Sequence, residues 1–181
     1  MKKIIIPIFV LLFILIITFY FNKSGFKKEE TNKEISQKII VESVFKEGEM
    51  IPAKYTCDGF NTNPPLTLKN LPRETKSLVI IVEDVDAPQG IFTHWLAWNI
   101  EPTENLPEEY QPPNEGLNDF GKINYGGPCP PPNSKPHRYF FKVLAINSLL
   151  NFPNGTKKEE ILSSLKGKIL AEGEIMGLYQ R

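Results

Sequence analysis

Two histidines and several acidic and aromatic residues stand at the ends of apolar segments, where their side chains could form a polar pocket. His137 and Tyr139 open an apolar segment directly after a loop rich in glycine and proline. Because side chains alternate along a strand, these two residues are predicted to share one face and Arg138 to occupy the other. An imidazole and a phenol can donate hydrogen bonds to an anion, whereas Arg138 is expected to form a structural ion pair.

A second polar group lies upstream and contains the only other histidine. Asp84 and Asp86 follow a long apolar run and flank Val85, so a strand would place both carboxylates on one face. Two adjacent carboxylates repel each other unless hydrogen bonds or a cation compensate. The pair could bind a metal, act as an acid and a base, or orient His94 and His137; a solvated strand end is the alternative. Since both histidines lie in such segments, we predict one polar pocket built from both.

The loop before His137 is a third candidate. Gly126 and Gly127 precede Pro128 and Cys129, and such a turn can aim successive N–H groups at an anion. Pro128 has no N–H, so the donors would come from Gly126, Gly127 or Cys129. The loop lacks the Lys-Ser/Thr end and the following helix of a nucleotide-binding P-loop. The alternative is that the glycines only permit a tight turn.

Cys57 and Cys129 are the two cysteines of the chain, and both lie in turn-like segments beside these groups. In an exported domain an isolated pair is expected to form a disulfide, and two buried thiols are the alternative. Neither cysteine has a partner at CxxC spacing, so the pair does not predict a metal site.

The first 38 residues differ in character from the rest. A basic start, Met1–Lys3, is followed by 18 uncharged residues from Ile4 to Phe21, and residues 22–38 are mostly polar. Residues 1–21 therefore predict a signal anchor or a signal peptide, and residues 22–38 a polar linker before a single domain over 39–181. No small-residue cleavage pattern follows, which favours an uncleaved anchor. We expect a membrane-anchored or secreted protein whose domain lies outside the cytoplasm.

The charge distribution argues against one class of partner. The whole chain has 21 basic and 21 acidic residues, but residues 39–181 hold 14 basic and 18 acidic ones, a net charge of −4. No basic patch or basic helix is visible, so we do not expect the protein to bind nucleic acid.

Apolar and β-branched segments alternate with long loops, which is typical of a β-protein. Strands are predicted over residues 39–45, 77–83, 93–100, 138–146 and 168–176. One helix is predicted near the C-terminus, where Thr156 and Glu159 match a capping box and Gly167 suits the helix end. Its apolar stripe consists of Ile161, Leu162 and Leu165. Five strands and one late helix favour a β-sandwich with a peripheral helix.

Taken together, these segments resemble the phosphatidylethanolamine-binding protein family, in particular its bacterial and archaeal branch of Raf-kinase-inhibitor-like proteins. The resemblance covers residues 40–181 and rests on motifs in the same order along the chain. They are Cys57-Asp58-Gly59, Asn63-Pro64-Pro65-Leu66, Asp84-Val85-Asp86-Ala87-Pro88, His94-Trp95, Asn118-Asp119-Phe120-Gly121, Tyr125-Gly126-Gly127-Pro128-Cys129-Pro130-Pro131 and His137-Arg138-Tyr139.

The resemblance implies a Greek-key β-sandwich with one or two peripheral helices and a small preformed anion pocket. It implies that the ligand-binding residues are Asp84, Asp86, His94, Gly127, Pro128, Cys129, His137 and Tyr139, with the loop 127–130 as a rim. One departure is visible, because Val85 stands where the family usually has proline. The spacing of the two acids is kept, but the local rigidity that proline confers is lost.

We therefore expect a binding protein rather than an enzyme, without a metal or cofactor. Its ligand would be a phosphate-type anion, either a phospholipid head group or a phosphorylated small molecule. Family members that inhibit kinases or proteases also imply a protein partner. The alternative is a hydrolase that uses the Asp and His residues with or without a metal, although no nucleophile with an adjacent base is evident. A structural or adhesive surface domain would not require these residues.

Overall fold

The computed structural model describes residues 37–181. The predicted anchor, residues 1–21, and most of the predicted linker lie outside the described residues. Within residues 37–181, no helix has the length and apolar character needed to span a bilayer.

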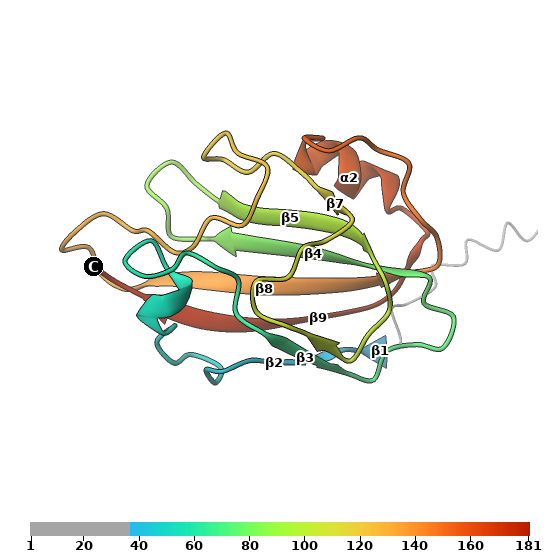
Figure 1. Cartoon of the computed structure of the whole chain (residues 1–181), viewed down its shortest axis with the longest axis horizontal. Helices are drawn as coiled ribbons and strands as arrows, with labels where there is room; N and C mark the ends of the chain where they lie inside the picture. The colour runs from blue at the N-terminus through green and yellow to red at the C-terminus, as the bar shows by residue number, and fades with distance from the viewer. Residues whose placement is uncertain (1–36) are drawn as a thin grey trace, which may run out of the picture. The chain divides into compact units, whose positions relative to one another are not determined.

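Two β-sheets form the body of the domain (Figure 1). The larger sheet has six strands in the order β1 (Gln37–Lys38), β9 (Ile169–Tyr179), β8 (His137–Ile146), β4 (Ser77–Asp84), β5 (Phe92–Ile100) and β7 (Asn114–Glu115). The smaller sheet has three, in the order β2 (Ile40–Glu42), β3 (Leu66–Lys69) and β6 (Asn105–Leu106). All neighbouring strands are antiparallel except β1 and β9. A short 3₁₀ turn, η1, covers Ala53–Tyr55. The mainly β fold of the described residues, with two sheets and one α-helix, agrees with the prediction.

Both faces of the larger sheet are covered, as the continuous apolar run of β4 predicts. Alternate residues of β4, such as Ile80 and Val82, lie in the main core with residues of the smaller sheet. The residues between them, Val79 and Ile81, lie in a second core with Ile161 and Leu165 from the helical segment. Every residue of β4 is buried, which explains why its sequence shows no alternation of polar and apolar residues.

The strand predicted over residues 39–45 is shorter than expected, because β2 is the part of it that forms, and β1 precedes it in the other sheet. β1 pairs with β9 in the larger sheet, and after Ile39 the chain continues as β2 in the smaller sheet. Gly173 on β9 permits this crossing, because a Cβ built there would lie 2.0 Å from the carbonyl oxygen of Ile39. The strand predicted over 168–176 is longer than expected, since β9 runs from Ile169 to Tyr179.

Within residues 37–181 the one α-helix, α2, covers Lys158–Ser164 and differs from the prediction at its start. Its N-cap is Lys157, and no side chain caps the helix, so the predicted capping box of Thr156 is wrong. The Thr156 hydroxyl instead donates to the carbonyl of Pro153 at 2.7 Å and closes the preceding turn. The apolar stripe is confirmed for Ile161 and Leu165, which are buried, whereas Leu162 is exposed.

Strand pairing brings both predicted polar segments to one end of the larger sheet. β4 ends at Asp84, which pairs with Phe92 at the start of β5 and with Tyr139 near the start of β8. The segment containing His94 and the segment containing His137 therefore lie on either side of β4. In Figure 1 this is the end at which the arrow of β4 points, opposite α2.

Candidate anion pocket

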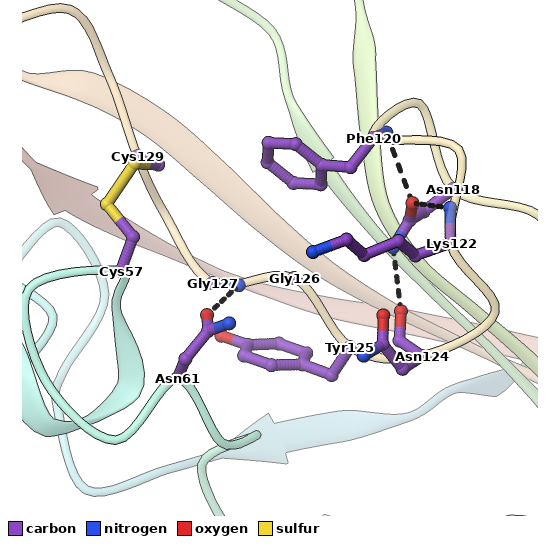
Figure 2. A pocket seen from close by; sticks show the side chains of 10 residues that line it. All are labelled: Cys57, Asn61, Asn118, Phe120, Lys122, Asn124, Tyr125, Gly126, Gly127 and Cys129. Carbon is purple, nitrogen blue, oxygen red and sulfur yellow. Dashed lines mark hydrogen bonds between the residues drawn. A yellow bond between two sulfur atoms is a disulfide. The ribbon is translucent and has the colours of Figure 1, made fainter.

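The loop that contains Gly126, Gly127 and Cys129 forms one side of the site, and hydrogen bonds and a disulfide hold it in place (Figure 2). The N–H of Gly126 donates to the carbonyl of His94 at 3.0 Å, and the N–H of Gly127 donates to Oδ1 of Asn61 at 2.7 Å. Both glycine N–H groups are therefore engaged within the protein, and the prediction that they would point at an anion is wrong.

The predicted disulfide between Cys57 and Cys129 is confirmed (Figure 2). It joins this loop to the segment that follows η1. Two hydrogen bonds support the same junction: the N–H of Cys57 donates to the carbonyl of Pro128 at 3.1 Å, and the Tyr125 hydroxyl donates to the carbonyl of Tyr55 at 2.9 Å. The loop position is thus set by covalent and hydrogen-bonded links to a segment distant in sequence.

Beside the loop lies a pocket of about 290 Å³, which we call the anion pocket. Three of the predicted side chains, Asp84, His94 and His137, line it together, as does Cys129. Pro130, at the end of the predicted rim 127–130, lines it as well. Sequence reasoning did not foresee the rest of the lining, which is mostly apolar: Ala87, Pro88, Gln89, Phe92, Phe120 and Pro131. The place of Phe120 in the Asn-Asp-Phe-Gly motif was a sequence signal that could have assigned it to the pocket. The centroid of its ring lies 5.2 Å from that of His94 and 4.7 Å from that of Phe92.

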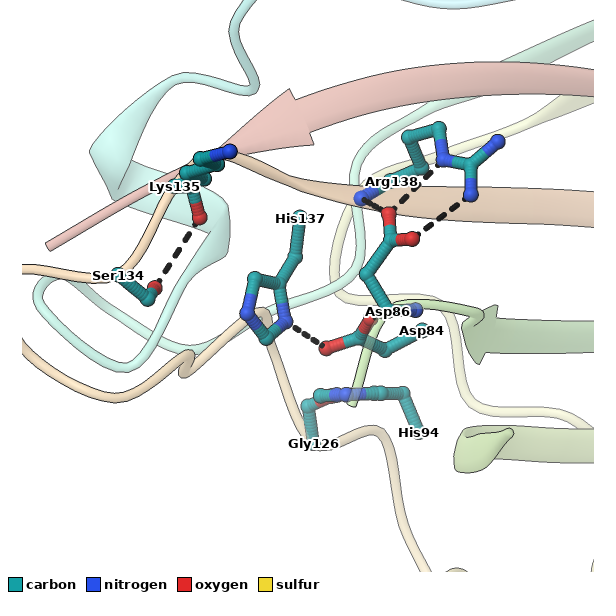
Figure 3. A network of polar contacts seen from close by, with 8 residues as sticks. All are labelled: Asp84, Asp86, His94, Gly126, Ser134, Lys135, His137 and Arg138. Carbon is teal, nitrogen blue, oxygen red and sulfur yellow. Dashed lines mark hydrogen bonds and ion pairs between the residues drawn. The ribbon is translucent and has the colours of Figure 1, made fainter. Parts of the chain in front are cut away.

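Asp84 holds His137 in place within the pocket (Figure 3). Oδ2 of Asp84 accepts a hydrogen bond from Nδ1 of His137 at 2.8 Å, and its Oδ1 accepts the N–H of Asp86 at 2.8 Å. Both side chains of the pair are buried, with 8% of His137 and 5% of Asp84 exposed. Because the carboxylate fixes the proton on Nδ1, the other ring nitrogen, Nε2, is left for a ligand.

A β-bulge directs His94 towards the pocket. Val82 pairs with Trp95 and Glu83 with Thr93, so His94 is an extra residue without a partner on β4. Simple alternation would place His94 with Leu96, on the face that α2 covers. Its ring instead packs edge-on against that of Tyr139, 5.2 Å away, on the side of the main core. The sequence pattern did not reveal this bulge.

The protonation of His94 follows from its surroundings. Its Nδ1 donates to the carbonyl of Gly126 at 2.7 Å, since a carbonyl can only accept. Burial lowers the pKa of His94, and nearby carbonyls and Asp84 only partly oppose this effect. At neutral pH the ring is therefore uncharged, with a proton on Nδ1 and an acceptor lone pair on Nε2.

The second acid, Asp86, lies elsewhere. β4 ends at Asp84, so the two acids do not share a strand face as predicted. Asp86 accepts hydrogen bonds from the N–H, Nε and an Nη of Arg138 at 2.7 to 2.9 Å, and it is not among the residues that line the anion pocket. The guanidinium of Arg138 lowers the pKa of Asp86 to about 2. The expectation that Arg138 forms a structural ion pair is confirmed.

The remaining predicted residues surround the pocket without lining it. Tyr139 shares a strand face with His137 as predicted, but it is fully buried in the main core. Its hydroxyl makes no hydrogen bond of good geometry within residues 37–181, and burial, then the nearby Asp84 carboxylate, raises its pKa. Gly127 and Pro128 hold in place the loop that carries Cys129, through hydrogen bonds to Asn61 and Cys57.

Metal binding finds little support in the described part of the chain. No three His, Cys, Asp or Glu side chains of residues 37–181 gather closely enough to hold an ion. What the pocket offers is two imidazoles and the carboxylate of Asp84 within mostly apolar walls.

Comparison with known proteins agrees with this architecture. The family model of phosphatidylethanolamine-binding proteins matches residues 41–180. The chain belongs to the phosphatidylethanolamine-binding protein family. A protein of Archaeoglobus fulgidus described as a UPF0098 protein is 48% identical over 157 residues, which are 82% of this chain and 53% of that relative. This chain thus matches about half the length of that relative. A Pyrococcus abyssi relative with the same description is 49% identical over 78% of this chain and 84% of its own length.

Solved structures of family members share the fold. A phosphatidylethanolamine-binding protein homologue from Chlamydia trachomatis is 40% identical and superposes with a TM-score of 0.75 over 81% of this chain and 99% of its own. The Escherichia coli protein YbcL, described as a new member of the mammalian family, is 31% identical with a TM-score of 0.73 over 80% of this chain and 99% of its own. The resemblance inferred from the motifs is therefore confirmed.

Proposed function

We propose that this chain binds a phosphate-type anion, carried by a phospholipid head group or a phosphorylated small molecule, in the anion pocket, and that it acts by binding rather than catalysis. One observation carries the proposal. Asp84, His94 and His137 come from three strands to line one pocket, and in each imidazole Nδ1 is already engaged. Two Nε2 atoms are thus left for the same ligand.

The proton positions suit a phosphate that keeps one proton. Such a group has a P–OH donor as well as anionic oxygens. The neutral His94 accepts from the P–OH through Nε2, while Nε2 of His137 can donate to an anionic oxygen when that ring is an imidazolium. The apolar walls formed by Phe92 and Phe120 limit competing water, which strengthens these hydrogen bonds.

The other parts of the proposal depend on this binding. Control of a kinase or protease would follow from it through a protein partner, and residues 1–21 would place the domain at or beyond a membrane. The hydrolase alternative rests on the same Asp and His residues and has no additional observation in its favour.

The test is isothermal titration of the full-length chain with inorganic phosphate, in mild detergent because of the apolar residues 4–21. We expect saturable binding that the double variant His94→Gln, His137→Gln abolishes. Arg138→Gln is the matched control, because Arg138 neighbours His137 in sequence but points to Asp86 outside the pocket. Phosphate binding that survives in the double variant, with the fold checked by circular dichroism, would contradict the proposal.

A further inference from the structure

A second hollow of about 190 Å³ adjoins the anion pocket, and we call it the Lys122 hollow. The two hollows share Phe120 and Cys129 as walls. The polar side chains that line the second one include Asn61, Lys122 and Asn124, and Figure 2 shows Lys122 extending into it. The two spaces are therefore neighbours, with Phe120 and Cys129 bordering both.

The Lys122 hollow is lined by hydrogen-bond donors and has no acid. None of its lining residues is Asp or Glu. The ammonium of Lys122 forms no ion pair or hydrogen bond within residues 37–181. Asn61 accepts the N–H of Gly127 through Oδ1, so its amide NH₂ group is left as a donor. A cation and an amide donor beside an apolar ring are suited to a carboxylate.

The anion pocket has the opposite composition. It contains the carboxylate of Asp84 and two histidines, and neither lysine nor arginine lines it. A second negative charge on a ligand would therefore find no cation in the anion pocket itself, but it would find Lys122 next to it. An ammonium that reached the Lys122 hollow would instead meet a like charge.

We infer that the Lys122 hollow is a second subsite, and that the preferred ligand is a phosphomonoester that also carries a carboxylate. This inference rests on the proposed function, since the phosphate must occupy the anion pocket. Lys122 is then the residue that selects such a ligand over an ethanolamine phosphate.

O-phosphoserine and phosphoethanolamine provide the test, because they differ by one carboxylate and share the phosphate and the ammonium. In titrations of the full-length chain at pH 6.0, where about half of a phosphomonoester keeps its proton, we expect O-phosphoserine to bind about two- to fivefold tighter, within the range of a solvent-exposed charge pair. Lys122→Gln should remove this preference and leave the affinity for inorganic phosphate unchanged. Lys166→Gln is the matched control, since Lys166 is exposed just after α2, at the other end of the sheet.

The outcomes separate the two proposals. If phosphate binds but O-phosphoserine has no advantage, or keeps its advantage in Lys122→Gln, the second subsite is wrong and the anion pocket stands. If none of the three phosphate compounds binds the wild-type chain, the proposed function itself is wrong. If Lys166→Gln reduces the preference as much as Lys122→Gln, net charge rather than the hollow is responsible.

Discussion

Nδ1 of His137 lies 2.8 Å from Oδ2 of Asp84, although the two residues are 53 positions apart in sequence. β4 and β8 pair so that Asp84 lies opposite Tyr139, and His137 is two residues before Tyr139, at the start of β8. The other oxygen of Asp84 accepts the N–H of Asp86. The carboxylate is thus held at both oxygens, and the imidazole that it orients is held with it.

Asp84→Asn should weaken phosphate binding about tenfold, because a charge-assisted hydrogen bond that orients His137 is replaced by a weaker one. The measurement is titration of wild type and variant with inorganic phosphate at pH 7.5. Asp84 also brings a negative charge close to the anion. Tighter binding by the variant would mean that repulsion outweighs orientation, and the role assigned to Asp84 would be wrong.

Asp86→Asn should leave the affinity for phosphate within about twofold and lower the stability by about 0.5 to 1 kcal/mol, because the substitution removes the partly exposed ion pair between Asp86 and Arg138. The pKa of Asp86 is lowered from 3.8 to about 2. Its contribution is therefore present above pH 3.8 and is lost as the pH falls from there towards 2.

Urea denaturation of wild type and Asp86→Asn at a series of pH values tests this. The difference in stability should be constant from pH 7 to 5 and disappear near pH 2. A large loss of phosphate affinity in this variant would instead show that Asp86 contributes to phosphate binding.

His94 should make the stability of the domain depend on pH near neutrality. Burial lowers the pKa of His94 below its ordinary value of 6.5 in the folded protein. Below pH 6.5 and above the lowered pKa of the folded state, the unfolded chain binds more protons at His94 than the folded protein does. Stability therefore falls as the pH drops below about 6.5. Denaturation curves from pH 8 to 5 should show this decline. His94→Gln should have a flatter profile over the same range, and an equally steep one would contradict the assignment.

Gly127→Ala should destabilise the protein by about 1 to 3 kcal/mol and weaken phosphate binding. A Cβ at this position would lie 2.6 Å from the carbonyl oxygen of Tyr55 and 2.8 Å from Cα of Thr56, so backbone would have to move. Gly126→Ala is the comparison, because the atoms nearest to its Cβ would belong to the side chains of Phe120 and Asn118 rather than to backbone. Thermal melting should rank Gly127→Ala as the more damaging change. Equal melting temperatures would show that the loop can shift freely.

Replacing both cysteines, Cys57→Ser and Cys129→Ser, should lower stability by about 2 to 5 kcal/mol, since the bridge closes a long loop between residues 72 positions apart. The double variant should also bind phosphate less tightly, because Cys129 lines the pocket. Wild type treated with a reductant is the control and should behave like the variant. Stability unaffected by either treatment would mean that the hydrogen bonds of Cys57 and Tyr125 alone hold the junction.

Periodicity along the sequence determined the class of fold. A continuous apolar run predicted the buried β4, and alternation of polar and apolar residues placed His137 and Tyr139 on one face with Arg138 on the other. These are local properties, because the direction of a side chain within a strand follows from its position in the strand. The order of the motifs along the chain predicted the family. The types of residue predicted a pocket around the two histidines, and the two cysteines predicted the disulfide.

Tertiary structure decided which candidates share the pocket. The end of β4 at Asp84 separates it from Asp86, and the bulge at His94 depends on pairing with a strand that the local pattern does not encode. The N–H groups of Gly126 and Gly127 were taken up by partners distant in sequence, His94 and Asn61. Which donors are left for a ligand depends on all contacts in the fold, because a hydrogen-bonding group already paired cannot serve a ligand as well.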